Sequence, residues 1–292
     1  MYIRRMALIA VVGALALTGC GREGEANGGS AVTAAASEGV AVAGSPTFDR
    51  MKSRGKVIIG VKEDQPNLGY KDPTTNTYSG FDVEIARLVA AGLGFSQDKI
   101  EYKAIPSANR EQEISNGNID YYVGTYSITD KRKQQISFAG PYFIAGQDLL
   151  VRKDDTAITG PDALTGKTVC SVTGSTSIQR IKEEQKQAKT VEFEKYSQCV
   201  EQLIAGEVDA VTTDDAILKG YAAQQPEQLK VVGKPFSEEK YGIGLNKDDK
   251  ALRDKVNDVL AASVTDGTWK KIYDSTLGKS GSPAEAPALE RY

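Results

Sequence analysis

The stretch NGNIDYYVGTYS (residues 116–127) has a counterpart later in the chain, AGEVDAVTTDDA (residues 205–216). In each stretch a glycine that can end a helix, Gly117 or Gly206, is followed by a polar residue, a β-branched residue and an aspartate. That aspartate leads into a run of residues that indicates a buried strand. The two halves of the chain therefore look like two copies of one α/β unit.

Strands and helices alternate on both sides of these stretches. The first half predicts strands at 56–61, 100–105 and 118–124, with helices at 80–94 and 108–116. The second half predicts strands at 167–172, 190–196 and 207–214, with helices at 174–188 and 197–206. This order is typical of open, mostly parallel sheets, which hold ligands at the carboxyl ends of their strands.

Two further extended segments connect the halves. QDLLVRKDD (147–155) would carry the chain into a second lobe, and EKYGIGLNKDD (239–249) would bring it back to the first. We therefore expect an α/β protein with two lobes, two crossing hinge strands and a cleft. The expected division is a signal at 1–19, a flexible tether at 20–46, lobe 1 at 47–150, lobe 2 at 151–239, a return to lobe 1 at 240–278 and a flexible tail at 279–292.

The first twenty residues differ in kind from the rest. Arg4 and Arg5 precede an apolar run (6–17) that is too short to cross a bilayer comfortably, which indicates a secretory signal. The LTGC that follows resembles the lipobox of bacterial lipoproteins, in which cleavage leaves a lipid-carrying cysteine, here Cys20, as the new amino terminus. An ordinary signal peptide with a chance cysteine is the alternative. Residues 21–46 are rich in Gly, Ala and Ser, which predicts the tether.

Composition excludes several classes of function. The chain has 292 residues, of which 40% are hydrophobic, and its formal net charge of −3 becomes −5 without Arg4 and Arg5. A weak negative charge does not suit a nucleic-acid-binding protein. Histidine is absent, which excludes histidine-dependent catalysis, and we expect neither a metal nor a cofactor. Cys170 and Cys199 predict a disulfide in an exported protein, with two buried free thiols as the alternative.

Polar side chains gather where the third strand of the first half ends. Thr125 and Ser127 come directly after that strand, so they would lie at the carboxyl edge of the sheet. Arg132 follows shortly, and its planar guanidinium suits a carboxylate better than the two lysines beside it do. This edge therefore predicts a place where a small anion is held.

The second half offers a complementary set. Ser175 and Thr176 open a helix whose first N–H groups can bind an anion, although helix capping alone would also explain these residues. Asp214 ends the third strand and could pair with an ammonium group, whereas Asp215 better suits the cap of the next helix. A carboxylate clamp and an ammonium clamp together match the zwitterion of an α-amino acid.

From about residue 57 to residue 277 the chain resembles the bacterial extracellular solute-binding proteins of family 3, the amino acid receptors of ABC importers. The motifs that carry the resemblance are GFDVEIA (80–86), NGNID (116–120), SITDKRK (127–133), FAGPYF (138–143), KTVCSVTGSTS (167–177) and AGEVDAVTTD (205–214). The resemblance implies a periplasmic-binding-protein type II fold with lobes that close on the ligand. It also implies that Arg132 binds the α-carboxylate and Asp214 the α-amino group, with Ser127 and the region of Thr176 completing the clamp.

Two basic residues are candidates for the pocket of the ligand's side chain. Lys62 follows the first strand, and Arg110 lies in a segment similar to one in family members that bind acidic amino acids. Either cation could instead be solvated surface. The segments VKEDQP, TGSTS and VTTDDAIL most resemble the glutamate-binding lipoproteins of high-GC Gram-positive bacteria. They imply a monomeric receptor, lipid-anchored on the extracellular face of the cytoplasmic membrane, that binds L-glutamate, or aspartate or glutamine, and delivers it to a permease.

Two other functions stay open at this point. The chain could be an amino acid sensing domain that acts with a membrane partner, or an enzyme like the dehydratases that share this fold. The expected ammonium clamp and the lipoprotein signal argue against catalysis, so we expect a protein that is not an enzyme. In the two-lobed arrangement Cys170 and Cys199 both fall in lobe 2, so their disulfide would leave the hinge free.

Overall fold

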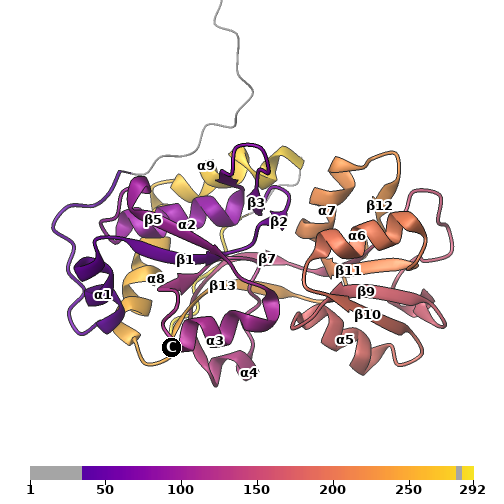
Figure 1. The fold of residues 1–292 in the computed structure, drawn as a ribbon, viewed down its shortest axis with the longest axis horizontal. Coiled ribbons are helices and arrows are strands. Elements are labelled where there is room, and N and C mark those ends of the chain that lie inside the picture. The colour runs from indigo at the N-terminus through magenta and orange to yellow at the C-terminus, as the bar shows by residue number, and fades with distance from the viewer. Residues whose placement is uncertain (1–34, 281–284) are drawn as a thin grey trace, which may run out of the picture.

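The computed structural model describes residues 35–280 and 285–292, so the predicted signal and Cys20 lie outside the described residues. Two five-stranded sheets form the cores of two lobes (Figure 1). The lobe 1 sheet has the order β5 (Ile100–Ala104), β1 (Val57–Val61), β6 (Tyr121–Tyr122), β13 (Glu239–Asn246) and β7 (Ile136–Ala145). The lobe 2 sheet has the order β10 (Lys189–Phe193), β9 (Thr168–Val172), β11 (Ala210–Asp214), β8 (Gln147–Arg152) and β12 (Leu229–Val231). A small sheet in lobe 1 contains β2 (Asp64–Gln65), β3 (Gly69–Lys71) and β4 (Tyr78–Ser79).

Each large sheet combines parallel and antiparallel pairs. β1 pairs in parallel with β5 and β6, and β9 pairs in parallel with β10 and β11, as the alternating pattern predicted. The crossing strands differ, because β13 is antiparallel to β6 and β7, and β8 is antiparallel to β11. These strands continue from one sheet to the other without a crossover helix, which is why they run against the parallel core.

Helices cover both faces of each sheet. Lobe 1 carries α1 (Pro46–Arg54), α2 (Phe81–Gly92), α3 (Arg110–Ser115), α4 (Asp130–Lys133), α8 (Lys250–Thr265) and α9 (Thr268–Ser275). Lobe 2 carries α5 (Thr176–Glu184), α6 (Tyr196–Ala205) and α7 (Asp215–Gln224). Short 3-10 helices lie at Gln97–Lys99, Ser107–Asn109, Pro161–Leu164 and Leu277–Ser280. In Figure 1, α2 and α9 lie above the lobe 1 sheet with α3 and α4 below it, and α6 and α7 lie above the lobe 2 sheet with α5 below.

The hinge is a pair of strand connections between the sheets. β7 ends at Ala145 in lobe 1 and β8 begins at Gln147 in lobe 2, with Gly146 between them. The chain returns to lobe 1 through β13, which begins at Glu239. The Gly146 amide donates to Asp215 Oδ1 at 3.2 Å, so the start of α7 is tied to this crossing point.

The C-terminal helices pack on lobe 1, as the sequence predicted. The Trp269 ring lies edge-on to the Phe81 ring, with centroids 5.9 Å apart, and Trp269 Nε1 donates to the Tyr142 carbonyl at 2.9 Å. α2 supplies the opposite side of this core through residues such as Phe81 and Ile85, which are fully buried. Burial of these aromatic rings holds the first and last parts of the folded chain together.

The predicted tether and tail are both shorter than expected. The Ser37 amide donates to the Ala91 carbonyl at 2.8 Å, Val42 is buried, and Ser45 caps α1 by accepting from the Phe48 amide. The tether therefore ends before residue 46, because a single valine and a capping serine attach its end to lobe 1.

The C-terminal residues also differ from the expected flexible tail. The Tyr292 hydroxyl accepts a hydrogen bond from the Phe138 amide at 2.8 Å, and the Glu290 amide donates to the Gly140 carbonyl at 2.8 Å. Phe138 and Gly140 belong to β7, which lies at the end of the lobe 1 sheet. The C-terminal residues thus form hydrogen bonds with backbone groups at the edge of the sheet. Local sequence does not reveal this interaction. None of the helices in the described part of the chain is long and apolar enough to span a membrane.

Candidate functional site

The carboxyl ends of strands from both lobes meet at a small cavity. Seven of the eight predicted ligand-binding residues line it, namely Arg110, Thr125, Ser127, Arg132, Ser175, Thr176 and Asp214. The volume of this cavity is about 10 Å³, roughly what one water molecule requires. The lobes are therefore closed on one another, and an amino acid could enter only after they move apart.

Asp214 is the last residue of β11 and is 4% exposed. Its Oδ2 accepts a hydrogen bond from the Tyr241 hydroxyl at 2.6 Å, whereas its buried Oδ1 has no partner within the described residues. Burial, followed by the nearby Glu239 carboxylate, raises the pKa of Asp214 to about 7. A buried carboxylate oxygen without a donor is costly, so this atom is suited to an ammonium group.

The helix cap after β11 is shifted by one residue from the prediction. Asp214, and not Asp215, occupies the N-cap position of α7, and its side chain makes no capping hydrogen bond. The strand leads into the helix without an intervening turn, so the cap falls on the last strand residue. Asp215 instead accepts from the Gly146 amide and forms an ion pair with Lys219 at 2.6 Å.

Arg132 lies in the four-residue helix α4 and is 7% exposed. Its Nε pairs with Glu111 Oε1 at 3.2 Å, and its Nη1 donates to the Ser127 carbonyl at 2.7 Å. Its Nη2 donates to the Gly174 carbonyl at 3.0 Å, and Gly174 belongs to lobe 2. In the closed state a lobe 2 carbonyl therefore occupies the donor that faces across the cleft, where a ligand carboxylate would bind after opening.

The backbone near Thr125 is held in an uncommon conformation. Thr125 has a φ of 46°, which a β-branched residue rarely adopts. Its amide donates to Asp82 Oδ2 at 2.9 Å, and the Tyr142 hydroxyl donates to Asp82 Oδ1 at 2.8 Å. Burial raises the pKa of Asp82 to about 7, partly offset by these two hydrogen bonds. Asp82 thus fixes the strand end that presents Thr125 and Ser127 to the cavity.

Ser175 and Thr176 have different surroundings. Ser175 Oγ accepts from the Ile178 amide at 3.1 Å, so the capping alternative accounts for this side chain. Thr176 Oγ1 donates to Glu239 Oε2 at 3.1 Å and lies 3.5 Å from Ser127 Oγ of lobe 1. The first N–H groups of α5 have no intrahelical acceptor and lie beside the cavity, as an anion site needs.

Arg110 and Lys62 are both buried, which rules out the solvated-surface alternative. Arg110 is 2% exposed, and its guanidinium carbon lies 4.1 Å from the centroid of the Tyr126 ring. Lys62 is 5% exposed and does not line the cavity, but its Nζ donates to Ser107 Oγ at 2.7 Å, and Ser107 does line it. Burial, followed by the positive charge of Arg110, lowers the pKa of Lys62 to about 7.

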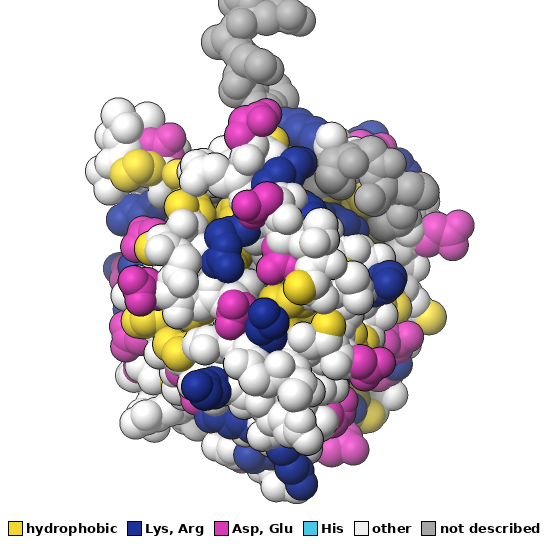
Figure 2. All heavy atoms as spheres, turned by 90° about the vertical axis from the view of Figure 1, so that its right-hand side faces the viewer, with side chains coloured by type: hydrophobic (Ala, Val, Ile, Leu, Met, Phe, Trp, Pro, Cys, Tyr) yellow, Lys and Arg dark blue, Asp and Glu magenta, His cyan; other side chains and the backbone are white. Residues whose placement is uncertain are grey.

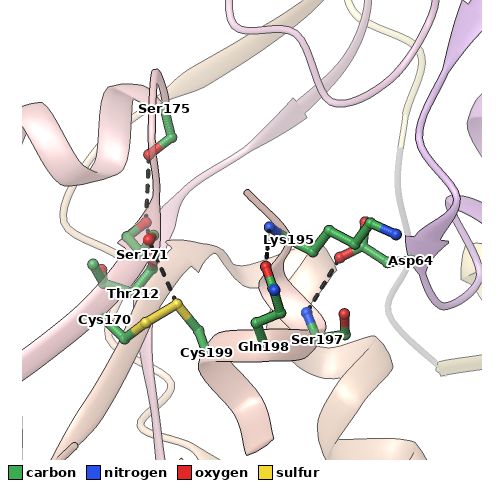
Figure 3. The surroundings of a disulfide bond; sticks show 9 residues. All are labelled: Asp64, Cys170, Ser171, Ser175, Lys195, Ser197, Gln198, Cys199 and Thr212. Atoms are coloured by element: carbon green, nitrogen blue, oxygen red, sulfur yellow. Dashed lines mark hydrogen bonds between the residues drawn. A yellow bond between two sulfur atoms is a disulfide. The ribbon is translucent and has the colours of Figure 1, made fainter. Parts of the chain in front are cut away.

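The predicted disulfide is confirmed and lies within lobe 2. It joins Cys170 on β9 to Cys199 on α6, with their Cα atoms 5.5 Å apart (Figure 3). Next to it, Ser171 Oγ donates to the Thr212 carbonyl at 2.7 Å and lies 3.4 Å from Ser175 Oγ. The bridge therefore fixes α6 against the strand that leads into the α5 turn.

Sequence reasoning missed several residues of the site. Ser107 and Tyr196 line the cavity, Asp82 supports Thr125, and the Tyr126 ring lies under both Arg110 and Arg132, 4.8 Å from the latter. Asp82 lies in the GFDVEIA segment, but Glu84 shares the same first helical turn, so the sequence did not single Asp82 out. The others are common residue types at unremarkable positions, so their roles follow only from packing.

The described part of the chain contains other hollows as well. One of about 500 Å³ borders the cavity and shares Ser107, Arg132, Ser175 and Thr176 with it. Acidic and basic side chains are interspersed over the end of lobe 2, which faces the viewer in Figure 2. Within the described ranges, no cluster of metal-ligating side chains is present. The polar cavity between the lobes is lined by several buried charged side chains.

Fold and site together define a two-lobed α/β protein with a charged cavity at its hinge. The family model for bacterial extracellular solute-binding proteins, family 3, matches residues 57–279. The chain belongs to this family.

Similarity to individual proteins covers three quarters of the chain or more. It is 37% identical to the glutamate-binding protein GluB of Corynebacterium efficiens over 96% of this chain and 94% of that protein. It is 40% identical to the glutamine-binding protein of Geobacillus stearothermophilus, over 84% of this chain and 92% of that protein. The solved structure of an ancestral arginine-binding protein bound to arginine matches with a TM-score of 0.72 at 36% identity, covering 76% of this chain and 98% of that one.

These similarities confirm the predicted family and the two-lobed type II fold. The chain is an amino acid solute-binding protein of the kind that serves ABC transporters, and it is not an enzyme. The relatives' ligands differ, since their names include glutamate, glutamine and arginine.

Proposed function

We propose that this chain binds L-glutamate between its lobes and passes it to the permease of an ABC importer. The observation that carries the proposal is a group of three buried cations, two that line the cavity and one beside it. Lys62, Arg110 and Arg132 are each at most 7% exposed. Of these three cations, Arg132 alone has a carboxylate of the described residues at ion-pair distance, Glu111 at 3.2 Å.

The charges divide naturally between the parts of an acidic amino acid. Arg132 and the α5 N-terminus suit the α-carboxylate, and Asp214 suits the ammonium group. Lys62 and Arg110 then remain for a second carboxylate on the ligand's side chain. Buried charges without partners are unfavourable, so a side-chain carboxylate gains more here than the neutral amide of glutamine does. Glutamine and aspartate are the nearest competitors.

Titration calorimetry with L-glutamate and L-glutamine tests the assignment. We expect Arg132→Ala to weaken the affinity for both ligands by at least roughly 100-fold, because a buried charge-assisted pair is lost. We expect Arg110→Ala to act mainly on glutamate and so to reduce the preference for it over glutamine. Arg50→Ala, in α1 and away from the cavity, is the matched control. Unchanged glutamate affinity in Arg132→Ala would refute the site.

A thermal-shift screen with the twenty amino acids tests the ligand itself. A ligand that binds only the folded state raises the melting temperature according to its affinity and concentration. We expect glutamate to give the largest shift, followed by glutamine or aspartate. A larger shift with arginine would overturn the proposal, since buried cations would repel that side chain.

We also propose that a lipid on Cys20 holds the receptor on the extracellular face of the cytoplasmic membrane. The support is the LTGC motif after a short apolar run, together with the extracellular family. Labelling of cells with a palmitate analogue should mark the wild-type chain and not Cys20→Ser. Equal labelling of both chains, or retention of Cys20→Ser in the membrane fraction, would contradict the anchor.

A further inference from the structure

Two contact zones between the lobes flank the cavity. In the first, the segment Glu63–Pro66 of lobe 1 contacts α6 and α7 of lobe 2. Lys195 Nζ pairs with Glu63 Oε1 at 2.6 Å, and the Ser197 amide donates to Asp64 Oδ2 at 3.2 Å, as Figure 3 shows for Asp64. The Tyr221 hydroxyl donates to the Asp64 carbonyl. This zone brings α7 against the lobe 1 backbone.

Gly220 of α7 lies against Pro66 of lobe 1 in this zone. A Cβ at Gly220 would lie 2.6 Å from the Pro66 carbonyl oxygen and 3.2 Å from Pro66 Cβ. The nearest obstacle is backbone, so it cannot rotate away as a side chain would. Glycine is disfavoured inside a helix, and Gly220 lies within α7. Its small size, rather than its flexibility, accounts for its presence.

The second zone places Gly174 of lobe 2 against Ala108 of lobe 1. A Cβ at Gly174 would lie 2.7 Å from Ala108 Cα and 2.9 Å from the Ala108 amide nitrogen. The Gly174 carbonyl accepts from Arg132 Nη2 at 3.0 Å and from Arg110 Nη2 at 3.4 Å. Gly174 also has a φ of 80°, so a side chain there would be strained as well as obstructed.

Both glycines thus lie on lobe 2, and both meet backbone atoms of lobe 1. A side chain at either position would keep the lobes apart, and at Gly174 it would also strain the backbone of lobe 2. We propose that Gly174 and Gly220 are positioning residues for closure of the lobes. They influence ligand affinity although neither binds the charged ends of the ligand. This inference rests on the proposed function, because closure is what retains an amino acid in the cavity.

Gly220→Ala is the sharper test, because alanine suits a helix. We expect the ligand-free variant to melt at the same temperature as wild type or higher, and to bind L-glutamate about 10-fold to 100-fold more weakly. Gly160→Ala is the matched control in lobe 2, because Gly160 has extended backbone (φ 161°) and a Cβ there meets nothing within 4 Å. Its affinity should equal that of wild type. A clearly lower melting temperature for Gly220→Ala would place the clash inside lobe 2 and overturn the inference.

A ligand-free measurement separates this inference from the proposed ligand. A carbodiimide joins a lysine to a carboxylate only when they touch, so a Lys195–Glu63 cross-link, detected by peptide mass spectrometry, reports the closed state. We expect this cross-link to form at least about 10-fold more slowly in Gly220→Ala than in wild type or Gly160→Ala. If wild type fails to bind glutamate while this difference holds, the ligand is wrong and the inference stands. Equal cross-linking rates and equal affinities in Gly220→Ala and wild type would refute it.

Discussion

Asp214 makes the proposed ammonium site sensitive to pH. Its pKa is raised to about 7 mainly by burial, so the carboxyl is largely protonated in the ligand-free protein below that pH. A ligand ammonium group favours the ionised form, and binding therefore releases a proton at acidic pH. We expect the affinity for glutamine to rise between about pH 5.5 and about pH 8 and then to level off.

Calorimetry across this pH range checks the expectation, with glutamine chosen because its neutral side chain does not require a charged Lys62. Asp214→Asn should bind roughly 100-fold more weakly and lose the pH dependence. Asp82, whose pKa is also raised to about 7, contacts Thr125 and Tyr142 and remains intact in that variant. A pH dependence that survives in Asp214→Asn would therefore shift the assignment to another group such as Asp82.

Lys62 should make the preference for glutamate depend on pH, in the direction opposite to the effect of Asp214 on affinity. Burial and Arg110 lower its pKa to about 7, while Asp64 and Asp82 act in the other direction and Arg132 adds to the lowering. The amine is therefore charged below that pH and loses its charge above it. We expect the ratio of glutamate affinity to glutamine affinity to fall as the pH rises through about 7. The ratio removes the effect of Asp214, which both ligands share.

In Lys62→Gln the ratio of glutamate affinity to glutamine affinity should be smaller and independent of pH. An unchanged ratio would exclude Lys62 from recognition.

At the scale of elements, the disulfide joins β9 to α6 across 29 residues. Closing a loop of that length stabilises the folded state by about 3.6 kcal/mol in the chain-entropy model. We expect the Cys170→Ser, Cys199→Ser double variant to unfold at a clearly lower urea concentration, with lobe 2 affected first. Wild type treated with a reducing agent should behave like the double variant. Identical midpoints with and without the bridge would contradict a stabilising role.

The C-terminal segment covers the edge of β7, and its contacts are confined to lobe 1. The charged groups of Lys133 and Arg253 both lie over the Tyr292 ring, 4.6 Å and 4.4 Å from its centroid. We expect removal of residues 285–292 to lower the free energy of unfolding by about 1–3 kcal/mol, since two edge hydrogen bonds and these ring contacts are lost. Tyr292→Phe keeps the ring and should cost about 1 kcal/mol. Urea unfolding measures both variants. Because lobe 2 and the residues that line the cavity are untouched, a large change in ligand affinity would contradict this picture.

At the scale of the molecule, the residues that would bind the ligand differ from those that limit how closely the lobes approach. The charged groups that face the cavity come from both lobes, Arg110 and Arg132 from short helices of lobe 1 and Asp214 from a strand end of lobe 2. The close contacts at Gly174 and Gly220 decide how far the lobes approach. The cavity is only about 10 Å³ in volume, so the structure corresponds to a closed state in which the Gly174 carbonyl contacts Arg132. A ligand must replace that contact, which links its affinity to the free energy of opening.

Much of this organisation could be predicted from the sequence. The repeated order of strand, helix and glycine predicted two α/β lobes, because the period of apolar residues reports local structure directly. Arg132 and Asp214 were placed at strand ends by the same reasoning, and the structure brings both to the cavity. Their roles toward a ligand stay predictions. The boundaries of the tether and the tail were wrong, since both segments are attached by a few contacts with distant residues.

The sequence by itself determined the family, the alternation of elements and the strand ends at which polar residues gather. Local patterns suffice there, because neighbours in the chain form helices and strands together. Only the tertiary structure decided that Asp82 accepts a hydrogen bond from the Thr125 amide and that Lys62 donates one to Ser107. It also decided that Gly174 and Gly220 contact the backbone of the other lobe. Each of these contacts joins residues far apart in the chain, and whether a glycine is there for flexibility or for space depends on what packs against it.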